Sequence, residues 1–309
     1  MNKLIVLTGP TAVGKSQLSI ELAKSIGGEI ISADSMQVYK YMDIGTDKIK
    51  KENMGGVPHH LIDILEPTDD FNVVLFQKLV KEAMAGIYHR GHIPILVGGT
   101  GFYIQAILYD IDFTDTDADM TYRHGLEQIA RIKGAGVLHR RLEEVDPESS
   151  ALIPEGNTKR VIRALEYYEK TGQKISEHNK EQRQKESPYD YKYFVLTDHR
   201  DILYDRIEKR VDKMIADGLE NECKELITMG VTPTMTSMQG LGYREMMEHI
   251  NGLYDLERAV YLIKRNTRHF AKRQLTWFRR EKDVIWVDKS EYNRDDALVL
   301  ETIIDKIDK

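Results

Sequence analysis

Residues 9–16 read Gly-Pro-Thr-Ala-Val-Gly-Lys-Ser and directly follow the apolar run Leu4-Ile5-Val6-Leu7. Gly9 and Gly14 permit backbone angles and close approaches that a side chain would prevent. In a loop of this kind, backbone N–H groups and the N-terminus of the following helix converge on an oligophosphate. Lys15 adds a positive charge, and the Ser16 hydroxyl is suited to bind Mg²⁺. The segment therefore predicts a phosphate-binding loop. A simple glycine-rich turn before a helix is the alternative.

The composition is that of an ordinary globular protein with one large or two modest domains. The chain has 309 residues, of which 41% are hydrophobic and 30% charged. No apolar run approaches the roughly 18 residues of a membrane span. A strand at the very start predicts no signal or transit peptide. Cys223 is the only cysteine, which excludes intramolecular disulfides and fits a reducing cytoplasm. With a net charge of −6, a nucleic acid would have to be bound by local basic patches.

The first third of the chain alternates buried strands with helical segments. Strands are predicted at 4–8, 28–33 and 93–97, and a long helix near 72–90. This alternation predicts an α/β fold of the P-loop NTPase type, with helices on both faces of a parallel sheet. Ligands bind such sheets at the carboxyl ends of the strands. The phosphate loop, Asp34 and Thr100 all come directly after predicted strands, so we expect them to share one crevice.

The remainder divides into an insertion and a return to the core. Residues 113–187 show no strand pattern and are broken by glycines and prolines, which predicts an inserted all-helical subdomain. Residues 1–112 and 188–309 then form the catalytic core. Strands are expected at 191–197 and 284–287, with long helices between about 199 and 280.

The residues directly after the strands indicate the chemistry. The strand at 93–97 ends in Gly-Gly-Thr-Gly instead of the acidic residue common in ATPases and GTPases. This favours a phosphorylated substrate over a nucleotide that is hydrolysed, and a small-molecule kinase remains an alternative. Asp34, opposite the phosphate loop, is suited to act as a general base or to cap the next turn.

A basic helix near the C-terminus suggests a second ligand. Residues 264–282 contain eight Lys or Arg and one acid, Glu281. An apolar stripe should turn this helix toward the core; it comprises Leu256, Val260, Ile263, Thr267, Phe270, Gln274 and Trp277. The insertion carries another basic cluster at Lys159, Arg160 and Arg163. Exposed cations beside aromatic residues favour RNA or DNA, while cations paired with nearby acids are the alternative.

Eight stretches of the chain resemble the tRNA dimethylallyltransferases, also called tRNA isopentenyltransferases, in their bacterial form without a C-terminal zinc finger. The matching stretches are 9–16, Ala-Asp-Ser-Met-Gln-Val-Tyr at 33–39, Met-Asp-Ile-Gly-Thr at 42–46, Val-Pro-His-His at 57–60, Leu-Val-Gly-Gly-Thr-Gly at 96–101, Arg-Val-Ile-Arg-Ala-Leu-Glu at 160–166, Gly-Leu-Gly-Tyr-Arg-Glu at 240–245 and Thr-Arg-His-Phe-Ala-Lys-Arg-Gln-Leu-Thr-Trp-Phe at 267–278. The resemblance implies transfer of a dimethylallyl group from dimethylallyl diphosphate to N6 of adenine 37 in the anticodon stem-loop of tRNA. An enzyme that acts on free AMP, ADP or ATP is the nearest alternative.

The resemblance also implies roles for individual residues. Asp34 is the base, and Lys15, Ser16 and Thr100 complete the catalytic set. Diphosphate contacts are assigned to Gly9, Pro10, Thr11, Ala12, Val13, Gly14, Lys15, Ser16, Arg206 and Arg210, with Mg²⁺ on Ser16. The tRNA contacts are assigned to Asp34, Ser35, Met36, Gln37, Thr100, Arg123, Lys159, Arg160, Val161, Ile162, Arg163, Gln239, Gly240, Leu241, Gly242, Tyr243, Arg244, Arg268, Lys272 and Arg273. No membrane and no obligate protein partner are inferred.

Several of these positions keep a structural alternative. Tyr243 fits equally well as a core residue with a bonded hydroxyl, and Gly240 and Gly242 as turn residues. His59 and His60 are interpreted as packing or hydrogen-bonding residues because no ligand cluster accompanies them. Asp47 departs from the family pattern, since its negative charge is expected to weaken nearby phosphate contacts.

Overall fold

The computed structural model describes residues 2–113 and 120–308. The chain forms two compact units, Met1–Leu108 with Pro188–Lys309, and Tyr109–Ser187. The first boundary lies before the predicted position at 112/113. The reason is local: the Asp110 carbonyl accepts from Lys185 Nζ and the Asp112 N–H donates to Gln182, so the segment after Leu108 is bonded to the helical unit.

A six-stranded parallel sheet forms the first unit, which confirms the α/β class. Its strand order is β3 (His59–His60), β2 (Gly28–Ser32), β4 (Ile93–Gly98), β1 (Asn2–Thr8), β5 (Tyr189–Thr197) and β6 (Val284–Asp288). The two-residue strand β3 was not predicted. Thr8 pairs with Gly98 on one side and Val195 on the other, so β1 and β4 end level with one another and β5 continues to Thr197.

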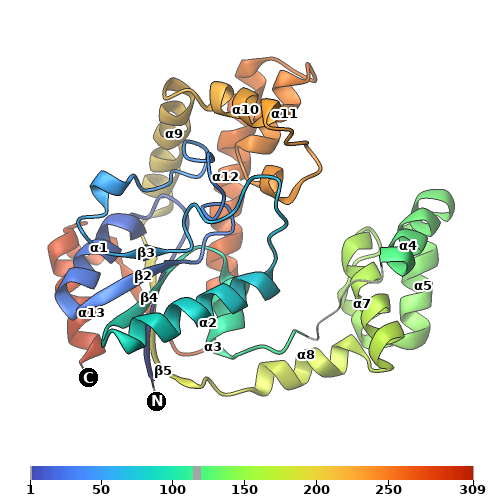
Figure 1. Ribbon diagram of the computed structural model, residues 1–309, viewed down its shortest axis with the longest axis horizontal. Coiled ribbons are helices and arrows are strands. Elements are labelled where there is room, and N and C mark those ends of the chain that lie inside the picture. The colour runs from blue at the N-terminus through green and yellow to red at the C-terminus, as the bar shows by residue number, and fades with distance from the viewer. Residues whose placement is uncertain (1, 114–119, 309) are drawn as a thin grey trace. The chain divides into compact units, whose positions relative to one another are not determined.

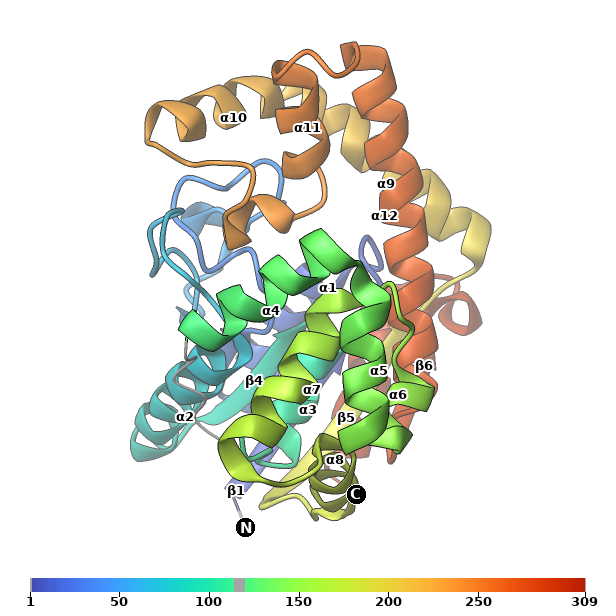
Figure 2. The same ribbon diagram turned by 90° about the vertical axis from the view of Figure 1, so that its right-hand side faces the viewer.

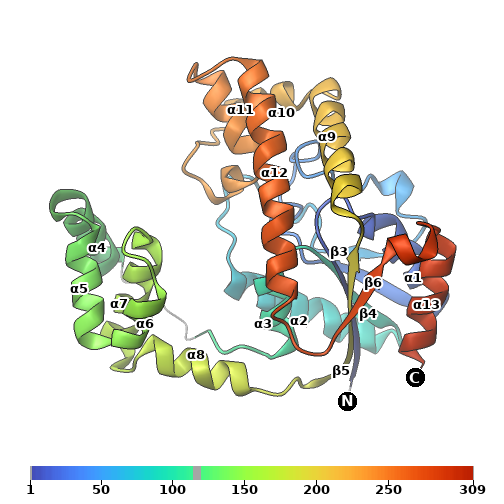
Figure 3. The ribbon, with the colours of Figure 1, turned by 180° about the vertical axis from the view of Figure 1, so that it is seen from behind.

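Both faces of the sheet are covered by helices, as predicted. Ile5 and Leu7 of β1 pack with Leu18 of α1 (Lys15–Ile26) and Ile303 of α13 (Asp296–Ile307). Helices α2 (Val73–His89) and α3 (Gly101–Leu108) pack on β4 from the other side (Figures 1 and 3). Because β1 is buried on both faces, it is a continuous apolar run and not an alternating one.

The C-terminal helices extend beyond the carboxyl ends of the strands. Helix α9 (Arg200–Ala216) lies beside α12 (Leu256–Phe278), α11 (Tyr243–Ile250) packs at one end of α12, and α10 (Leu219–Thr228) packs on α11 and α9 (Figure 2). The buried residues of α12 are Ala259, Ile263, Ala271, Gln274 and Phe278. Ile263 and Gln274 of the predicted stripe are therefore buried, whereas its other members are not fully buried. Three short 3₁₀ helices complete the unit: η1 (Lys51–Asn53), η2 (Thr236–Gln239) and η3 (Lys289–Tyr292).

The second unit is all-helical within its described residues. It comprises α4 (Met120–Lys133), α5 (Ala135–Val145), α6 (Pro147–Leu152), α7 (Thr158–Thr171) and α8 (Ile175–Gln184). Leu126, Leu138, Leu142 and Leu165 form its core. The buried carboxylate of Asp146 accepts hydrogen bonds from Ser149 and Ser176, which ties α6 to α8. Across both units, the described helices include none that is long and apolar enough to span a membrane.

Candidate active site

The loop between β1 and α1 has the geometry of an anion cradle. A Cβ on Gly9 (φ +146°) would lie 2.4 Å from the Leu196 carbonyl oxygen of β5, so no other residue fits there. Gly14 (φ +96°) caps α1 in the left-handed region. Within residues 2–113 and 120–308, no acceptor bonds the N–H groups of Ala12, Val13 or Gly14. Three backbone donors at a helix N-terminus thus remain available for phosphate oxygens.

Lys15 and Ser16 begin α1 at this loop. Lys15 Nζ donates to the carbonyls of Gly9 (3.0 Å) and Pro10 (2.9 Å). Burial, followed by the nearby charge of Arg210, lowers the pKa of Lys15 to about 8, while the Asp34 carboxylate opposes this shift. The Ser16 side chain is exposed, and its hydroxyl bonds nothing in the described part of the chain. A hydroxyl oxygen beside a phosphate cradle is a suitable ligand for Mg²⁺.

The two arginines predicted for the diphosphate are held differently. Arg210 Nη1 donates to Thr11 Oγ1 at 3.0 Å and Nη2 to the Thr46 carbonyl at 3.3 Å, which brings its guanidinium to the phosphate loop. Its Nε lies 3.4 Å from a carboxylate oxygen of Asp47, the position that departs from the family pattern. Arg206 instead lies 3.2 Å from Asp198, a buried carboxylate after β5. The geometry therefore favours Arg210 over Arg206 as a direct phosphate ligand.

Asp34 lies just after β2, at the carboxyl ends of the strands, as the phosphate loop does after β1. Its Oδ1 accepts from the Met36 N–H at 2.9 Å, so the predicted turn-capping contact exists. The second carboxylate oxygen accepts no hydrogen bond from any residue of the described ranges. Burial and then the charge of Asp34 raise the pKa of Tyr103, on α3, to about 12. Asp34 thus shares one electrostatic neighbourhood with Lys15 and Tyr103.

Thr100 follows a strand end that contacts the end of the strand before Asp34. A Cβ on Gly98 would lie 2.4 Å from the Ala33 carbonyl, so the backbones that lead to Asp34 and Thr100 touch. The carbonyl of Thr100 starts α3 by accepting from Tyr103 and Ile104, and its side chain is half-exposed. The structure therefore brings together the phosphate loop, Asp34 and Thr100, as predicted from the strand ends.

Segments 34–37 and 239–244, predicted for tRNA, also meet. Gly240 lies against Met36, where a Cβ would be 3.0 Å from Sδ. The Gln37 amide bonds Ser32 and the Thr46 carbonyl, and Ser35 is half-exposed. The other members have these surroundings: Gln239 is exposed and donates to Pro233, Leu241 is half-buried, Gly242 donates its N–H to Glu245, and Arg244 pairs with Glu245.

Three residues that were predicted to contact tRNA have buried side chains, so these side chains are not available to the RNA. Tyr243 is completely buried and donates its hydroxyl to Glu222 at 2.6 Å, so the core alternative applies. Val161 and Ile162 face the core of the helical unit, because they lie on the apolar face of α7 that packs on Leu138 and Leu142. Their neighbours Lys159, Arg160 and Arg163 are exposed. Arg123 is half-buried and forms a bidentate pair with Glu166.

The basic face of α12 is only partly available. Lys264 pairs with Asp212 and Arg268 with Glu208 of α9, so the paired-face alternative holds for these two. Lys272 and Arg273 are exposed and form no ion pair with any described residue. Together with Thr276, Trp277 and Arg280 they line a pocket of about 270 Å³. Cations beside an indole ring suit an RNA backbone.

Sequence reasoning missed two polar residues that organise the site. Gln274, assigned to the core stripe of α12, bonds the Thr11 N–H and the Gly99 carbonyl. Glu222 accepts from the N–H groups of Asp43, Ile44 and Gly45 and from the Tyr243 hydroxyl. A glutamine within an apolar stripe was the available signal for the first. The second had none, since its backbone partners are 177 to 179 residues away.

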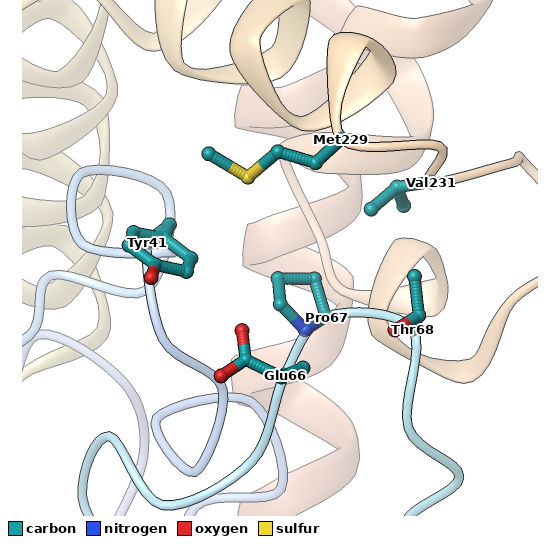
Figure 4. A pocket seen from close by; sticks show the side chains of 6 residues that line it. All are labelled: Tyr41, Glu66, Pro67, Thr68, Met229 and Val231. Atoms are coloured by element: carbon teal, nitrogen blue, oxygen red, sulfur yellow. The ribbon is translucent and has the colours of Figure 1, made fainter.

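Two other features lie outside the crevice. His59 Nδ1 lies 2.8 Å from the Val57 carbonyl and His60 Nε2 lies 2.6 Å from Glu29, which confirms the hydrogen-bonding interpretation. A pocket of about 280 Å³ between the loop at 66–68 and the end of α10 contains none of the predicted site residues (Figure 4). It is lined by Tyr41, Glu66, Pro67, Thr68, Met229 and Val231.

Comparisons with known proteins agree with this arrangement. The IPP transferase family model matches residues 37–281. The chain belongs to the IPP transferase family. An isopentenyl transferase model also matches residues 2–63. The chain is 56% identical to a protein of Lachnoclostridium phytofermentans named tRNA dimethylallyltransferase, over 98% of this chain and 97% of that one. A protein of the same name from Carboxydothermus hydrogenoformans is 51% identical, over 99% and 96%.

Solved structures give the same family. The crystal structure of a tRNA isopentenylpyrophosphate transferase from Bacillus halodurans matches with 44% identity and a TM-score of 0.74, over 100% of this chain and 97% of that one. A eukaryotic dimethylallyltransferase described as acting on tRNA matches with 31% identity and a TM-score of 0.81, over 93% and 74%. These relatives support a prenyltransferase and not the kinase alternative.

Proposed function

We propose that this protein transfers a dimethylallyl group from dimethylallyl diphosphate to N6 of adenine 37 in the anticodon stem-loop of tRNA and releases diphosphate. The observation that carries the proposal is that an anion cradle follows β1 and a carboxylate follows β2, the two strands that flank β4. The free N–H groups at Ala12 to Gly14 lie in the same loop as Thr11, which Arg210 bonds, and the charge of Asp34 acts on Lys15 at the start of α1. The first group suits a diphosphate leaving group, and the second suits proton removal from an amine.

In the proposed reaction the C1–O bond of the donor breaks as the bond between C1 and N6 forms. The electron pair of the broken bond goes to the diphosphate, whose growing charge is stabilised by the loop N–H groups, Lys15 and Arg210. Adenine N6 is a weak nucleophile, and the free oxygen of Asp34 accepts its proton. Thr100, two residues after the end of β4, would orient the adenine.

Mg²⁺ is a proposed cofactor. The Ser16 hydroxyl, exposed beside the phosphate cradle, and the donor's own phosphate oxygens would supply its ligands. Mg²⁺ commonly binds in this way, with one or two protein ligands and substrate phosphates. When bound, it would supply further charge stabilisation to the leaving group.

The tRNA contacts are proposed from exposed cations in each unit. Adenine 37 must leave its stack to reach a donor bound at the strand ends. Exposed Lys or Arg side chains bind phosphates and orient the RNA, while sequence is read at the bases. The cations that fit are Lys272 and Arg273 on α12 and Lys159, Arg160 and Arg163 on α7.

Transfer of labelled dimethylallyl groups tests the proposal. With Mg²⁺ and labelled dimethylallyl diphosphate, we expect label in a tRNA that has adenine 37 and none in AMP. Label in AMP would instead indicate a free-nucleotide isopentenyltransferase, and consumption of ATP without label transfer would indicate a kinase.

Replacement of Asp34 tests its proposed role as the general base. We expect Asp34→Asn to lower kcat by about 10²- to 10⁴-fold, the usual contribution of a general base. The Kd for tRNA, measured by filter binding, should stay within a few-fold. The amide oxygen of asparagine can still accept the hydrogen bond from the Met36 N–H, so the shape of this turn is kept. A variant with normal kcat would contradict the assignment.

A further inference from the structure

The amide of Gln274 joins two loops of the candidate site. This side chain is only 6% exposed although it is polar and lies on a long helix. Its Oε1 accepts from the Thr11 N–H at 2.9 Å, and its Nε2 donates to the Gly99 carbonyl at 3.0 Å. A neutral amide both accepts and donates, so it satisfies two backbone groups of opposite kind at once.

We propose that Gln274 is a positioning residue that holds the phosphate loop at a fixed distance from the Gly99–Thr100 loop. The proposal deepens the function proposed above and takes its substrates from there. Gln274 touches neither reacting group in this scheme. It acts through Thr11, at the entry to the diphosphate cradle, and through Gly99, the residue before Thr100.

The Gly98–Gly101 segment is shaped to receive this helix. A Cβ on Gly99 would lie 2.1 Å from Nε2 of Gln274, and a Cβ on Gly101 would lie 2.2 Å from Cδ1 of Trp277, one turn further along α12. Contacts below 3.0 Å cannot form without a shift of the backbone or the side chain. The absence of side chains at Gly99 and Gly101 therefore allows α12 to pack closely against the end of β4. From there the amide of Gln274 reaches the phosphate loop.

In the phosphate loop, Thr11 is held at its N–H group and at its hydroxyl. Its N–H is bonded by Gln274 and its hydroxyl by Arg210. The next three N–H groups, at Ala12, Val13 and Gly14, carry no protein acceptor within the described ranges and are the ones available to phosphate oxygens. Donors that are already oriented stabilise developing charge without reorganisation. Loss of the Gln274 amide should therefore weaken phosphate binding without removing any phosphate ligand.

A methionine variant tests this role. Gln274→Met keeps the length of the side chain and removes both hydrogen bonds. We expect the Kd of inorganic pyrophosphate with Mg²⁺, measured by calorimetry, and the KM of dimethylallyl diphosphate each to rise about tenfold, as the loss of one or two ordinary hydrogen bonds implies. The KM of tRNA should change less than twofold. Gln77→Met is the matched control, because Gln77 on α2 also donates to a backbone carbonyl, that of Ala106 on α3, away from the phosphate loop.

Partial misfolding would give a different result from loss of positioning. It would lower the number of pyrophosphate sites per molecule and kcat, but leave Kd and the donor KM unchanged. That result, or equal behaviour of the Gln274 and Gln77 variants, would overturn the inference. Pyrophosphate binding does not depend on transfer, so an enzyme that binds pyrophosphate but transfers nothing would contradict the proposed function alone.

A glutamate variant gives a second, independent readout. In Gln274→Glu the ionised carboxylate still accepts from Thr11 but faces the Gly99 carbonyl without a proton to donate. Protonation restores that donor, and burial raises the pKa of such a carboxyl. The ratio of the variant's pyrophosphate Kd to that of the wild type should therefore narrow toward one as the pH falls from about 8 to about 5.5. A ratio that is independent of pH would overturn the inference.

Discussion

At the scale of single residues, the crevice is governed by a few charges held close together. Lys15, Arg210 and Asp34 influence one another, and the balance leaves the pKa of Lys15 at about 8, well below that of a free lysine. Lys15 is therefore charged at neutral pH but close to losing its proton. Its charge is available to a diphosphate under these conditions and disappears in mildly alkaline solution.

Pyrophosphate binding should accordingly depend on pH. Lys15 is protonated below its pKa, so affinity should be greatest below about pH 8 and fall as the pH rises through that value. Bound anion favours the protonated form, which moves the midpoint upward. Calorimetry across this pH range measures the effect, with Lys15→Met as the control. If the wild type and Lys15→Met lost affinity in parallel, Lys15 would not be the titrating group.

A second residue-scale charge lies near the amino ends of β2 and β4, at the opposite end of these strands from Asp34 and Thr100. Glu29, on β2, is 1% exposed; its bidentate bond from Arg90, followed by its bonds from His60 and His92, lowers its pKa to about 2 against the opposing effect of burial. A carboxyl with a pKa below its unfolded value contributes stability above that value and loses it as the pH falls. For Glu29 this window runs from about pH 4.5 down to 2.

Glu29→Gln should thus lower the thermal midpoint at neutral pH by several degrees, since the shift corresponds to a free energy of about 3 kcal/mol. The difference from wild type should shrink at about pH 3.5, where the contribution of Glu29 is partly lost. Glu21→Gln is the control, because Glu21 forms an exposed pair with Lys24. A difference that stays constant between the two pH values would contradict the role of the charge. Scanning calorimetry measures both midpoints.

At the scale of elements, segment 43–46 is held in place by helix α10 in addition to its own local hydrogen bonds. Glu222 accepts hydrogen bonds from three successive backbone N–H groups, at Asp43, Ile44 and Gly45. Its carboxylate also accepts a hydrogen bond from the Tyr243 hydroxyl of α11. The same segment offers the Thr46 carbonyl to Gln37 and Arg210. Glu222 therefore connects α10 and α11 with residues on both sides of the crevice.

Glu222→Gln should both destabilise the protein and impair catalysis. An amide keeps one oxygen acceptor but turns an NH₂ group toward backbone donors, and an unsatisfied buried group costs about 1–3 kcal/mol. We expect a lower thermal midpoint and a kcat/KM for dimethylallyl diphosphate reduced about tenfold. Glu225→Gln, exposed on the same helix, should match the wild type in both assays. An unchanged kcat/KM in a destabilised Glu222→Gln variant would limit Glu222 to stability.

At the scale of the whole molecule, a net charge of −6 makes the distribution of cations more important than their number. Many cations are already paired within the protein, as Lys264, Arg268 and Arg123 are. Exposed cations without ion pairs among the described residues include Lys272 and Arg273 in the first unit and Lys159 and Arg160 in the second. Binding of an RNA should therefore draw phosphate contacts from exposed cations of both units.

The salt dependence of tRNA binding measures these contacts. Each phosphate contact contributes a slope of about −0.7 to −0.9 in log K against log salt concentration. Lys272→Ala with Arg273→Ala, and separately Lys159→Ala with Arg160→Ala, should each make the slope shallower by about one to two, and the combined variant by their sum. Lys306→Ala removes an exposed charge from α13 and should leave the slope unchanged. Filter binding at several salt concentrations tests this, and a normal slope for the Lys159 and Arg160 variant would exclude these two residues from phosphate contacts.

The amino-acid sequence by itself determined the features that arise from local rules. The order of β1, loop and α1 follows from an apolar run, two glycines and a lysine, and the parallel sheet from strands that alternate with helices. Asp34 and Thr100 could be placed at strand ends because a strand's end is visible in its own residues. The short strand β3, by contrast, has only two residues and no pattern of its own.

Tertiary structure alone decided which polar side chains serve the site. Gln274 meets Thr11 across 263 residues and Glu222 meets Asp43 across 179, and no local pattern encodes a hydrogen bond to a distant backbone group. It also decided which cations remain exposed, since Arg268 and Lys264 are paired only because α9 lies beside α12. Tyr243, Val161 and Ile162 belong to the core for the same reason: burial is set by the elements that pack on a residue, and those elements come from elsewhere in the chain.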